Sequence, residues 1–302
     1  MRLVVAVGGN ALLERGERPE AELQEHHALA AVEALAPLAA EHQLVVTHGN
    51  GPQVGLLAVE STRDPDLDHP FPLDVLGAQT QGMIGYFFLQ AFENLVPDRS
   101  VASLVCQTLV TSDDPAFADP TKFVGSVMEA EEAHAQAGRY GWTVRPDGPR
   151  WRRVVPSPEP RRIVELPTVR LLLEAGTIVV CSGGGGVPVV RGDDGRLHGV
   201  EAVIDKDLAA SLMATDLDAD SLVLLTDVSA VITGFGTDHA RPLGRVTVAE
   251  LRAEPFAAGS MGPKVEAACR FAEGTGRPAR IGRLADSADV LAGRAGTEVV
   301  AG

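Results

Sequence analysis

Three lysines are the residues of this chain whose type and placement could do chemistry. Of its 26 basic residues only Lys122, Lys206 and Lys264 are lysines, so arginine is the usual basic residue. Lysine carries a compact ammonium on a flexible stem, whereas arginine presents a rigid planar fork. Each lysine could therefore serve where a movable point charge is needed, although a biased codon supply could also leave three lysines by chance. The residues around each lysine bear on whether it has a chemical role or is there by chance.

None of the three lysines lies in the sequence of a plain surface helix. Lys122 occurs in "DPTKFVG", within an irregular stretch, while Lys206 and Lys264 begin expected helices in "VIDKDLAA" and "GSMGPKVEAA". A positive charge in the first turn opposes the helix dipole, which makes sense if the ammonium faces a bound polyanion. Asp207 could orient the lysines and keep them protonated. It could also be a simple N-cap of the helix.

Three glycine-rich turns each follow a predicted strand: "VGGNA", "THGNGPQVG" and "CSGGGGVPVV". Glycine lets backbone N–H groups approach a ligand closely, and a helix that begins there favours an anion. One such cluster could be only a tight turn, but three indicate binding of phosphate or a similar anion. They match neither GxxxxGK[ST] nor GxGxxG, which disfavours a P-loop NTPase and a Rossmann dehydrogenase. Backbone amides and movable ammonium groups are what phosphoryl transfer requires of a protein.

Short β-branched runs alternate with Ala- and Leu-rich stretches, which predicts an α/β fold with a mostly parallel sheet covered by helices. The carboxyl ends of such strands gather ligand-binding loops at one edge of the sheet. We expect strands at 2–7, 43–48, 101–110, 177–182 and 221–226, short strands near Ala279 and Val299, and helices at 22–41, 74–95, 207–215 and 262–274.

Residues 112–160 interrupt this alternation. The segment is rich in Pro, Gly, Asp and Arg, and residues 138–162 hold seven arginines. "RPDGPR" is typical of a turn between two short strands. We interpret the segment as a lid, a dimer arm or both, and its basic character favours contact with an anionic ligand. An ordinary solvated hairpin is the alternative.

Composition narrows the class of protein. The 302 residues are 45% apolar with a net charge of −15, which argues against nucleic acid and anionic membranes as partners. No apolar run is long enough to span a bilayer, and the first residues resemble a strand more than a secretion signal. The three cysteines are widely spaced, which is typical of buried thiols in a cytoplasmic protein. We expect "RGDDGR" to be a hairpin turn and not a calcium loop. We expect His48 to lie either in the hydrophobic core or at the active site.

Several longer motifs carry a resemblance to a known family. They are "GGNAL", "THGNGPQVGLL", "PLDVLGAQTQGMIGY", "PTK", "RRVVPSPEP", "GGGGVPVV", "GVEAVIDKDLA", "LLTDV", "AGSMGPKVEAA" and "GTEV". Almost end to end, the chain resembles the carbamate kinases of the amino-acid kinase superfamily. The resemblance implies an enzyme of arginine metabolism that reversibly converts ATP and carbamate into ADP and carbamoyl phosphate.

The resemblance also implies a fold: an open αβα sandwich forming one domain over residues 1–302, with a small protruding lid subdomain and usually a homodimer. Residues up to about 200 would hold carbamate, and residues 201–302 the nucleotide. Mg²⁺ would be held mainly by the nucleotide phosphates, with no dedicated protein ligand. The site residues that it implies are, for catalysis, Lys122, Lys206, Lys264 and Asp207; for carbamate and the phosphoryl group, Gly8, Gly9, Asn10, Gly49, Asn50 and Gly51; and for the nucleotide, Gly184, Gly185, Thr226, Asp227, Val228 and Met261.

Two sequence details bear on the branch of the superfamily. Relatives that act on N-acetylglutamate or UMP generally carry a lysine before the first glycine pair, but here the strand reads "AVGG". That absence fits the carbamate branch, in which the lid lysine Lys122 takes over the role. The family usually continues Pro-Ile-Gly-Pro after this lysine, whereas this chain has "KFVGSVM", which should loosen the lid. The alternatives are a sibling kinase acting on another small carboxylate or phosphonate, and a nucleotide sensor without turnover.

Overall fold

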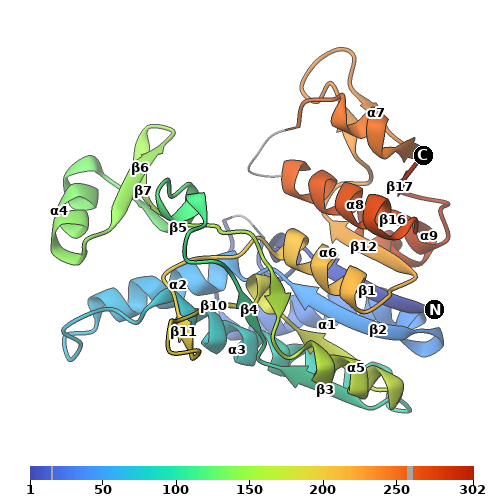
Figure 1. The fold of residues 1–302 in the computed structure, drawn as a ribbon, viewed down its shortest axis with the longest axis horizontal. Helices are drawn as coiled ribbons and strands as arrows, with labels where there is room; N and C mark the ends of the chain where they lie inside the picture. Colours follow the sequence, from blue (N-terminus) through green and yellow to red (C-terminus); the bar gives the residue numbers. More distant parts are fainter. Residues whose placement is uncertain (15, 257–260) are drawn as a thin grey trace.

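An eight-stranded sheet organises the chain, whose computed structural model describes residues 1–14, 16–256 and 261–302 (Figure 1). The strands of this sheet are β1 (Arg2–Val7), β2 (Gln43–His48), β3 (Val101–Leu104), β9 (Ile178–Cys181), β12 (Ser221–Thr226), β15 (Arg245–Thr247), β16 (Ala279–Arg283) and β17 (Thr297–Val300). Their order is β15-β17-β16-β12-β1-β2-β9-β3. Every neighbouring pair is parallel except β16 and β17, so the predicted α/β fold with a mostly parallel sheet is confirmed.

Helices cover both faces of this sheet, as the alternation of buried side chains in β1 shows. Leu3, Val5 and Val7 pack in one core and Val4 and Ala6 in another, so the whole strand is apolar. The first core lies under α1 (Ala21–Glu41), α3 (Leu73–Leu95) and α9 (Ser287–Leu291). The second lies under α5 (Leu166–Glu174), α6 (Lys206–Asp216), α7 (Val248–Arg252) and α8 (Met261–Thr275).

The predicted strand 101–110 is in fact two strands in two different sheets. β3 ends at Leu104, and β4 (Gln107–Leu109) belongs to a four-stranded sheet with β8 (Arg162–Ile163), β10 (Val187–Arg191) and β11 (Leu197–Gly199). Cys106, between them, exchanges two hydrogen bonds with the Gln81 amide, at 3.0 and 3.1 Å. These bonds hold Cys106 between the two sheets, and its carbonyl also accepts a hydrogen bond from the N–H of Val187, the first residue of β10, at 2.8 Å. "RGDDGR" joins β10 to antiparallel β11, which confirms the hairpin turn.

Residues 122–155 form a separate small body that protrudes at the left of Figure 1. It is a three-stranded antiparallel sheet, in the order β5-β7-β6, with one helix: β5 (Lys122–Met128), α4 (Ala130–Tyr140), β6 (Thr143–Asp147) and β7 (Arg150–Val155). The hairpin around "RPDGPR" is confirmed, as β6 pairs with β7. Helix α4 was not predicted; its end at Gly141, in a left-handed conformation, is a common sequence signal that the Pro- and Arg-rich surroundings obscured. We call this body the lid.

The three glycine-rich loops lie against one another at the carboxyl ends of β1, β2 and β9. A Cβ atom built at Gly49, after β2, would lie 2.6 Å from the amide nitrogen of Gly9, after β1. A Cβ at Gly183 would overlap the His48 ring, and one at Gly184 would overlap the Asn50 side chain. Glycine is therefore required here so that the loop backbones can touch.

Three smaller findings complete the fold. Cys106, Cys181 and Cys269 are buried free thiols, as predicted. Within the described ranges, no helix is both long and apolar enough to cross a membrane. The remaining elements are helix α2 (Gly51–Arg63), the strand pair β13 (Ile232–Thr233) and β14 (Arg241–Pro242), and the short 3-10 turns η1 (Gly9–Ala11), η2 (Pro115–Phe117), η3 (Gly183–Gly185) and η4 (Leu284–Asp286).

Replacing Gly49 with alanine should destabilise the protein by about 1–3 kcal/mol, because the backbone of Gly9 cannot move away cheaply. Gly274→Ala is the matched control, since Gly274 is exposed in α8 and nothing lies within 4 Å of its Cβ position. The control should be as stable as the parent or up to about 1 kcal/mol more stable. Urea unfolding midpoints measure both, and equal midpoints for Gly49→Ala and the parent would contradict the close approach.

Candidate active site

Asp207 binds two of the three lysines in a buried position at the start of α6. Its Oδ1 accepts a hydrogen bond from Nζ of Lys206 at 2.5 Å, and its Oδ2 accepts one from Nζ of Lys264 at 3.0 Å. The Asp207 side chain is 7% exposed, and the two lysine side chains are 12% and 13% exposed. Two ammonium groups from different helices therefore share one carboxylate.

Asp205, two residues earlier, divides its oxygens between the helix and the third lysine. Its Oδ1 accepts hydrogen bonds from the N–H groups of Asp207 and Leu208, at 3.0 and 3.3 Å, so Asp205 and not Asp207 is the N-cap of α6. Its Oδ2 accepts a hydrogen bond from Nζ of Lys122 at 3.0 Å. Lys122 comes from β5 of the lid. All three lysines thus reach carboxylates within a single short segment.

Burial and charge act against each other in this cluster. Burial alone would raise the pKa of Asp207, but the charges of Lys206 and Lys264 and their hydrogen bonds outweigh it and lower the pKa to about 2. Burial lowers the pKa of Lys206, and the Asp207 carboxylate opposes that shift. Asp207 is therefore ionised at neutral pH and stabilises the charged form of the lysine beside it.

The glycine loops add backbone donors. The N-terminus of α2 begins at Gly51, and the preceding Asn50 makes no capping bond through its side chain, which instead donates to Oγ1 of Thr80 at 2.8 Å. The first N–H groups of a helix of this length form an anion site. Gly8 and Gly9 lie in the loop after β1, which contacts the loop after β2. The N–H of Gly8 donates to the carbonyl of Leu225 at 3.0 Å, which ties this loop to the end of β12.

The predicted nucleotide residues fall in two places. Asn10 connects the first loop to the end of β12, because its Nδ2 lies 3.4 Å from Oδ2 of Asp227. Burial raises the pKa of Asp227, but bonds from Thr226 and Asn10 outweigh this and lower it. Val228 follows in the same turn. Met261 opens α8, three residues before Lys264, and packs against the core.

The other two nucleotide predictions lie apart from that group. Gly184 contacts Asn50, and Gly185 contacts Ile204, next to the Asp205 segment. The structure thus brings Gly184 and Gly185 to the glycine loops of the phosphoryl side. Residues 258–260 of the motif that leads into α8 lie outside the described residues.

His48 packs against the glycine-rich loops after β2 and β9. Its ring is buried, stacks on Phe88 with centroids 5.8 Å apart, and lies 3.0 Å from the Gly49 carbonyl through Nδ1. Burial lowers its pKa to about 4, so the imidazole is neutral at physiological pH. Of the two sequence interpretations, the core residue is the better one.

Several lid arginines are paired with carboxylates, and the expectation that the basic insert contacts an anionic ligand stays a prediction. Within the described part of the chain, four such ion pairs are Arg145–Asp119, Arg150–Glu129, Arg152–Asp147 and Arg153–Glu201. Most of the positive charge of the insert is therefore balanced by neighbouring side chains.

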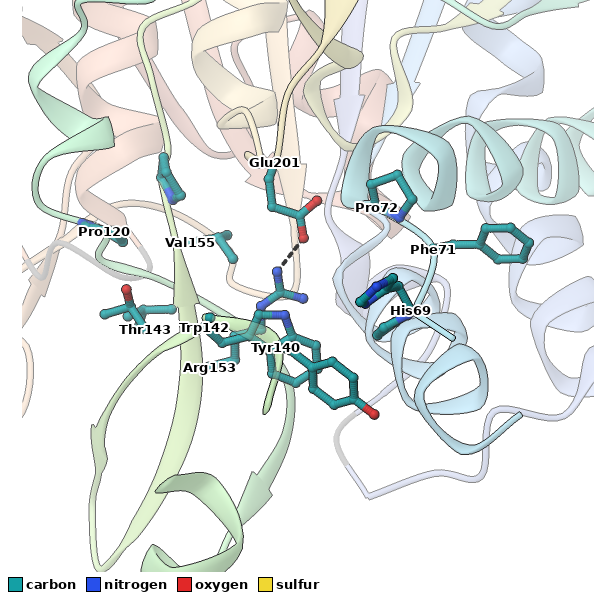
Figure 2. Close-up of a pocket in the computed structure, with 14 residues that line it drawn as sticks. His69, Phe71, Pro72, Pro120, Tyr140, Trp142, Thr143, Arg153, Val155 and Glu201 are labelled. Carbon is teal, nitrogen blue, oxygen red and sulfur yellow. Dashed lines mark hydrogen bonds and ion pairs between the residues drawn. The ribbon is translucent and has the colours of Figure 1, made fainter. Parts of the chain in front are cut away.

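A cavity of about 320 Å³ lies between the lid and the rest of the protein (Figure 2). Its wall includes Pro120, two residues before Lys122, and Glu201, four residues before Asp205, together with aromatic side chains of the lid. Sequence reasoning missed Asp205 and Glu201 as functional residues. The signal for Asp205 was present, because an aspartate directly before an apolar helical run is a typical N-cap.

Comparisons with known proteins agree on one family. The model of the amino acid kinase family matches residues 1–283. The chain is 51% identical to the carbamate kinase of Rhizobium meliloti (strain 1021) over 301 residues, covering 98% of this chain and 92% of that protein. It is 48% identical to the carbamate kinase of Escherichia coli (strain K12) over 295 residues, covering 98% of each. A solved carbamate kinase from Giardia lamblia bound to AMP-PNP is 37% identical with a TM-score of 0.93, covering 100% of this chain and 98% of that one.

Protonation of Asp207 should make the protein less stable in acid. Its pKa is about 2 in the folded protein but ordinary when unfolded, so the unfolded chain binds the proton first as the pH falls. The stabilisation is complete above about pH 4 and is lost between about pH 4 and pH 2. Urea midpoints across this range should show that part of the loss in the parent but not in Asp207→Asn.

The same variant should be less stable at pH 7, by on the order of 3 kcal/mol, because two buried ammonium groups lose their counter-charge. Asp238→Asn, in an exposed loop, is the control and should behave like the parent. An acid profile of Asp207→Asn that overlays the parent's would show that Asp207 does not hold the lysines.

Proposed function

The chain belongs to the amino acid kinase family, among its carbamate kinases, and we propose that its lysine cluster and glycine loops transfer the γ-phosphoryl group of ATP to carbamate. The observation that supports this assignment of residues is the meeting of Lys122, Lys206 and Lys264 on Asp205 and Asp207, beside the start of α6. Phosphoryl transfer needs such charge and positioning more than it needs covalent chemistry from the protein.

In the proposed reaction an oxygen of carbamate attacks the γ-phosphorus, and the bond from that phosphorus to the bridging oxygen of ADP breaks. The loop of Gly8, Gly9 and Asn10 and the loop of Gly49, Asn50 and Gly51 hold carbamate and the moving group. The N–H groups of Gly8 and Gly49 donate to the carbonyls of Leu225 and Val7, so these two glycines shape the loops while their neighbours supply the donors. Lys206 and Lys264 neutralise charge that develops on the phosphate oxygens. Asp207 keeps both lysines charged and aimed. In the reverse direction carbamoyl phosphate donates its phosphoryl group to ADP.

Lys122 acts from the other side, carried by the lid. It exchanges Asp205 for the transferred group when substrates are bound, which its position on a separate body allows. Residues 112–160 are accordingly the lid segment. Residues up to about 200 form the carbamate side, and residues 201–302 the nucleotide side.

The nucleotide is held by Thr226, Asp227, Val228 and Met261, with Gly184 and Gly185 closest to its phosphates. The bonds of Asp227 to Thr226 and Asn10 support a shared wall between the nucleotide and the phosphoryl site. A solved relative, the Giardia lamblia carbamate kinase, binds AMP-PNP, which supports ATP as the donor.

Mg²⁺ bound to the nucleotide would neutralise charge on the phosphates. The donors of the chain fit this arrangement. Asp205 and Asp207 are already paired with lysines, and the described residues contain no group of three carboxylate, imidazole or thiol side chains that could hold a metal ion. Phosphate oxygens and water must therefore supply most of the ligands.

The purified protein should form ATP from carbamoyl phosphate and Mg-ADP, and Lys122→Ala should lower turnover by about 10³-fold or more while ADP binding stays nearly intact. Luciferase detection of ATP and calorimetric titration with ADP measure the two quantities. Ser126→Ala, an exposed position of the same strand, is the control. Comparable turnover by Lys122→Ala and the parent would remove Lys122 from the mechanism.

A second candidate is a sibling activity on another small carboxylate or phosphonate, because the same machinery would serve it. Coupled measurement of ADP release with carbamate, acetate, acetylglutamate and UMP separates the two. Turnover with one of the other acceptors that exceeds turnover with carbamate would favour the sibling activity.

We also propose that the protein is a homodimer joined through α3. Val75 and Tyr86 of this helix are eleven residues apart, hence on one side, and are 38% and 51% exposed, with Phe71 nearby at 45%. An apolar stripe of this kind marks an interaction surface. Sedimentation should give twice the mass of the 31.7 kDa chain, and Tyr86→Arg should shift it toward the monomer. Leu171→Arg, on the opposite layer in α5, should not; a monomeric parent would refute the proposal.

A further inference from the structure

The lid meets the rest of the protein at an ion pair between a buried arginine, Arg153, and a partly exposed glutamate, Glu201 (Figure 2). Arg153 lies on β7 of the lid and is only 7% exposed. Its guanidinium lies 4.1 Å from the ring centroid of Trp142, so an aromatic face of the lid fixes its orientation. A buried guanidinium without a counter-charge would be strongly destabilising, which makes the pairing with Glu201 obligatory in this position.

Glu201 is anchored to the main body of the protein. One of its oxygens accepts a hydrogen bond from the N–H of Leu73, the first residue of α3, at 2.8 Å, while the other faces Arg153. Close by, Val203 N–H donates to the carbonyl of Pro156, directly after β7, at 3.0 Å. Arg153 therefore ties the lid to a carboxylate that a long helix holds in place. This ion pair adds to the apolar packing of Val124 and Val155 of the lid against α2 and α3.

The same two segments that form this ion pair also carry Lys122 and its partner. On the lid, β5 pairs with β7 so that Val124 lies opposite Arg153 and Lys122 opposite Val155. On the body, Glu201 precedes Asp205 by four residues, and Asp205 accepts the hydrogen bond from Lys122. A rotation of the lid about this junction would move Lys122 relative to Asp205.

Arg153 differs in this respect from its neighbours on the lid. Arg150 pairs with Glu129 and Arg152 with Asp147, and both partners belong to the lid segment itself. Loss of either pair would leave the attachment to the body unchanged. The cavity of about 320 Å³ adjoins Arg153 and Glu201, so there is space for the lid to move if their ion pair is lost.

We propose that Arg153, through Glu201, is a positioning residue that fixes the lid at the angle at which Lys122 reaches the phosphoryl site. The inference rests on the proposed role of Lys122.

The first test compares turnover with nucleotide affinity. Arg153→Met keeps the stem but removes the charge, and Glu201→Gln keeps the acceptor for Leu73 N–H. Each should lower kcat for ATP formation by about 10- to 100-fold, because a displacement of about 1 Å costs this much. The dissociation constant of Mg-ADP should stay within about twofold. The double variant should be no slower than the slower single variant, since the two residues act as one unit.

Arg150→Met, on the same strand, is the matched control and should keep the parental kcat. Arg153→Met with parental kcat would overturn the inference, as would a double variant whose losses multiply. A parallel loss of Mg-ADP affinity would assign the pair to overall stability and would equally overturn it. Lys122→Ala separates the two proposals: if it is inactive while Arg153→Met is fully active, only the inference about Arg153 fails.

The second test measures the lid directly. Spin labels at Ala135→Cys in α4 and Glu33→Cys in α1 lie on exposed positions of the lid and the body, and the three native cysteines are buried. The distance distribution between the labels should be narrow in the parent and in Arg150→Met, and broad in Arg153→Met. An unchanged distribution in Arg153→Met would refute a role in positioning the lid.

Discussion

The site depends on keeping the ammonium groups of Lys206 and Lys264 charged where little water reaches them. Asp207 achieves this for two lysines by binding one with each oxygen, and its own pKa falls to about 2 as a result. The arrangement is reciprocal, because the lysines keep the carboxylate ionised and the carboxylate keeps the lysines protonated. Since α6 and α8 contribute one lysine each, the packing of these helices on the sheet sets the distance between the two charges.

The second requirement is close approach of three loop backbones, which only glycine permits. Gly49 against Gly9, and Gly184 against Asn50, bring the ends of β1, β2 and β9 into contact. The parallel order of these strands places all three loops at one edge of the sheet. Lys206 and Lys264 come from helices and Lys122 from a strand of the lid, while the loops contribute backbone groups.

The sequence predicted well what is local and repetitive. β1, β2 and β12 were placed residue for residue, since a central parallel strand is an unbroken apolar run. The break at Cys106 could not be predicted, because it arises from hydrogen bonds with Gln81, distant in sequence. The meeting of the lysines was inferred from their types and neighbourhoods, and the resemblance added their individual roles. The pairing of Asp205 with Lys122 and that of Arg153 with Glu201 escaped prediction, because each joins segments far apart in the chain.

The division of labour within the Asp205 carboxylate has a consequence for how the enzyme cycles. Its Oδ1 secures the first turn of α6, and only its Oδ2 faces Lys122. In the proposed mechanism Lys122 leaves Asp205 for a ligand, while the start of α6 keeps its cap, so Lys206 and Asp207 need not shift. One oxygen of Asp205 therefore caps the helix permanently and the other binds the lid lysine reversibly, so that the lid can move without displacing α6.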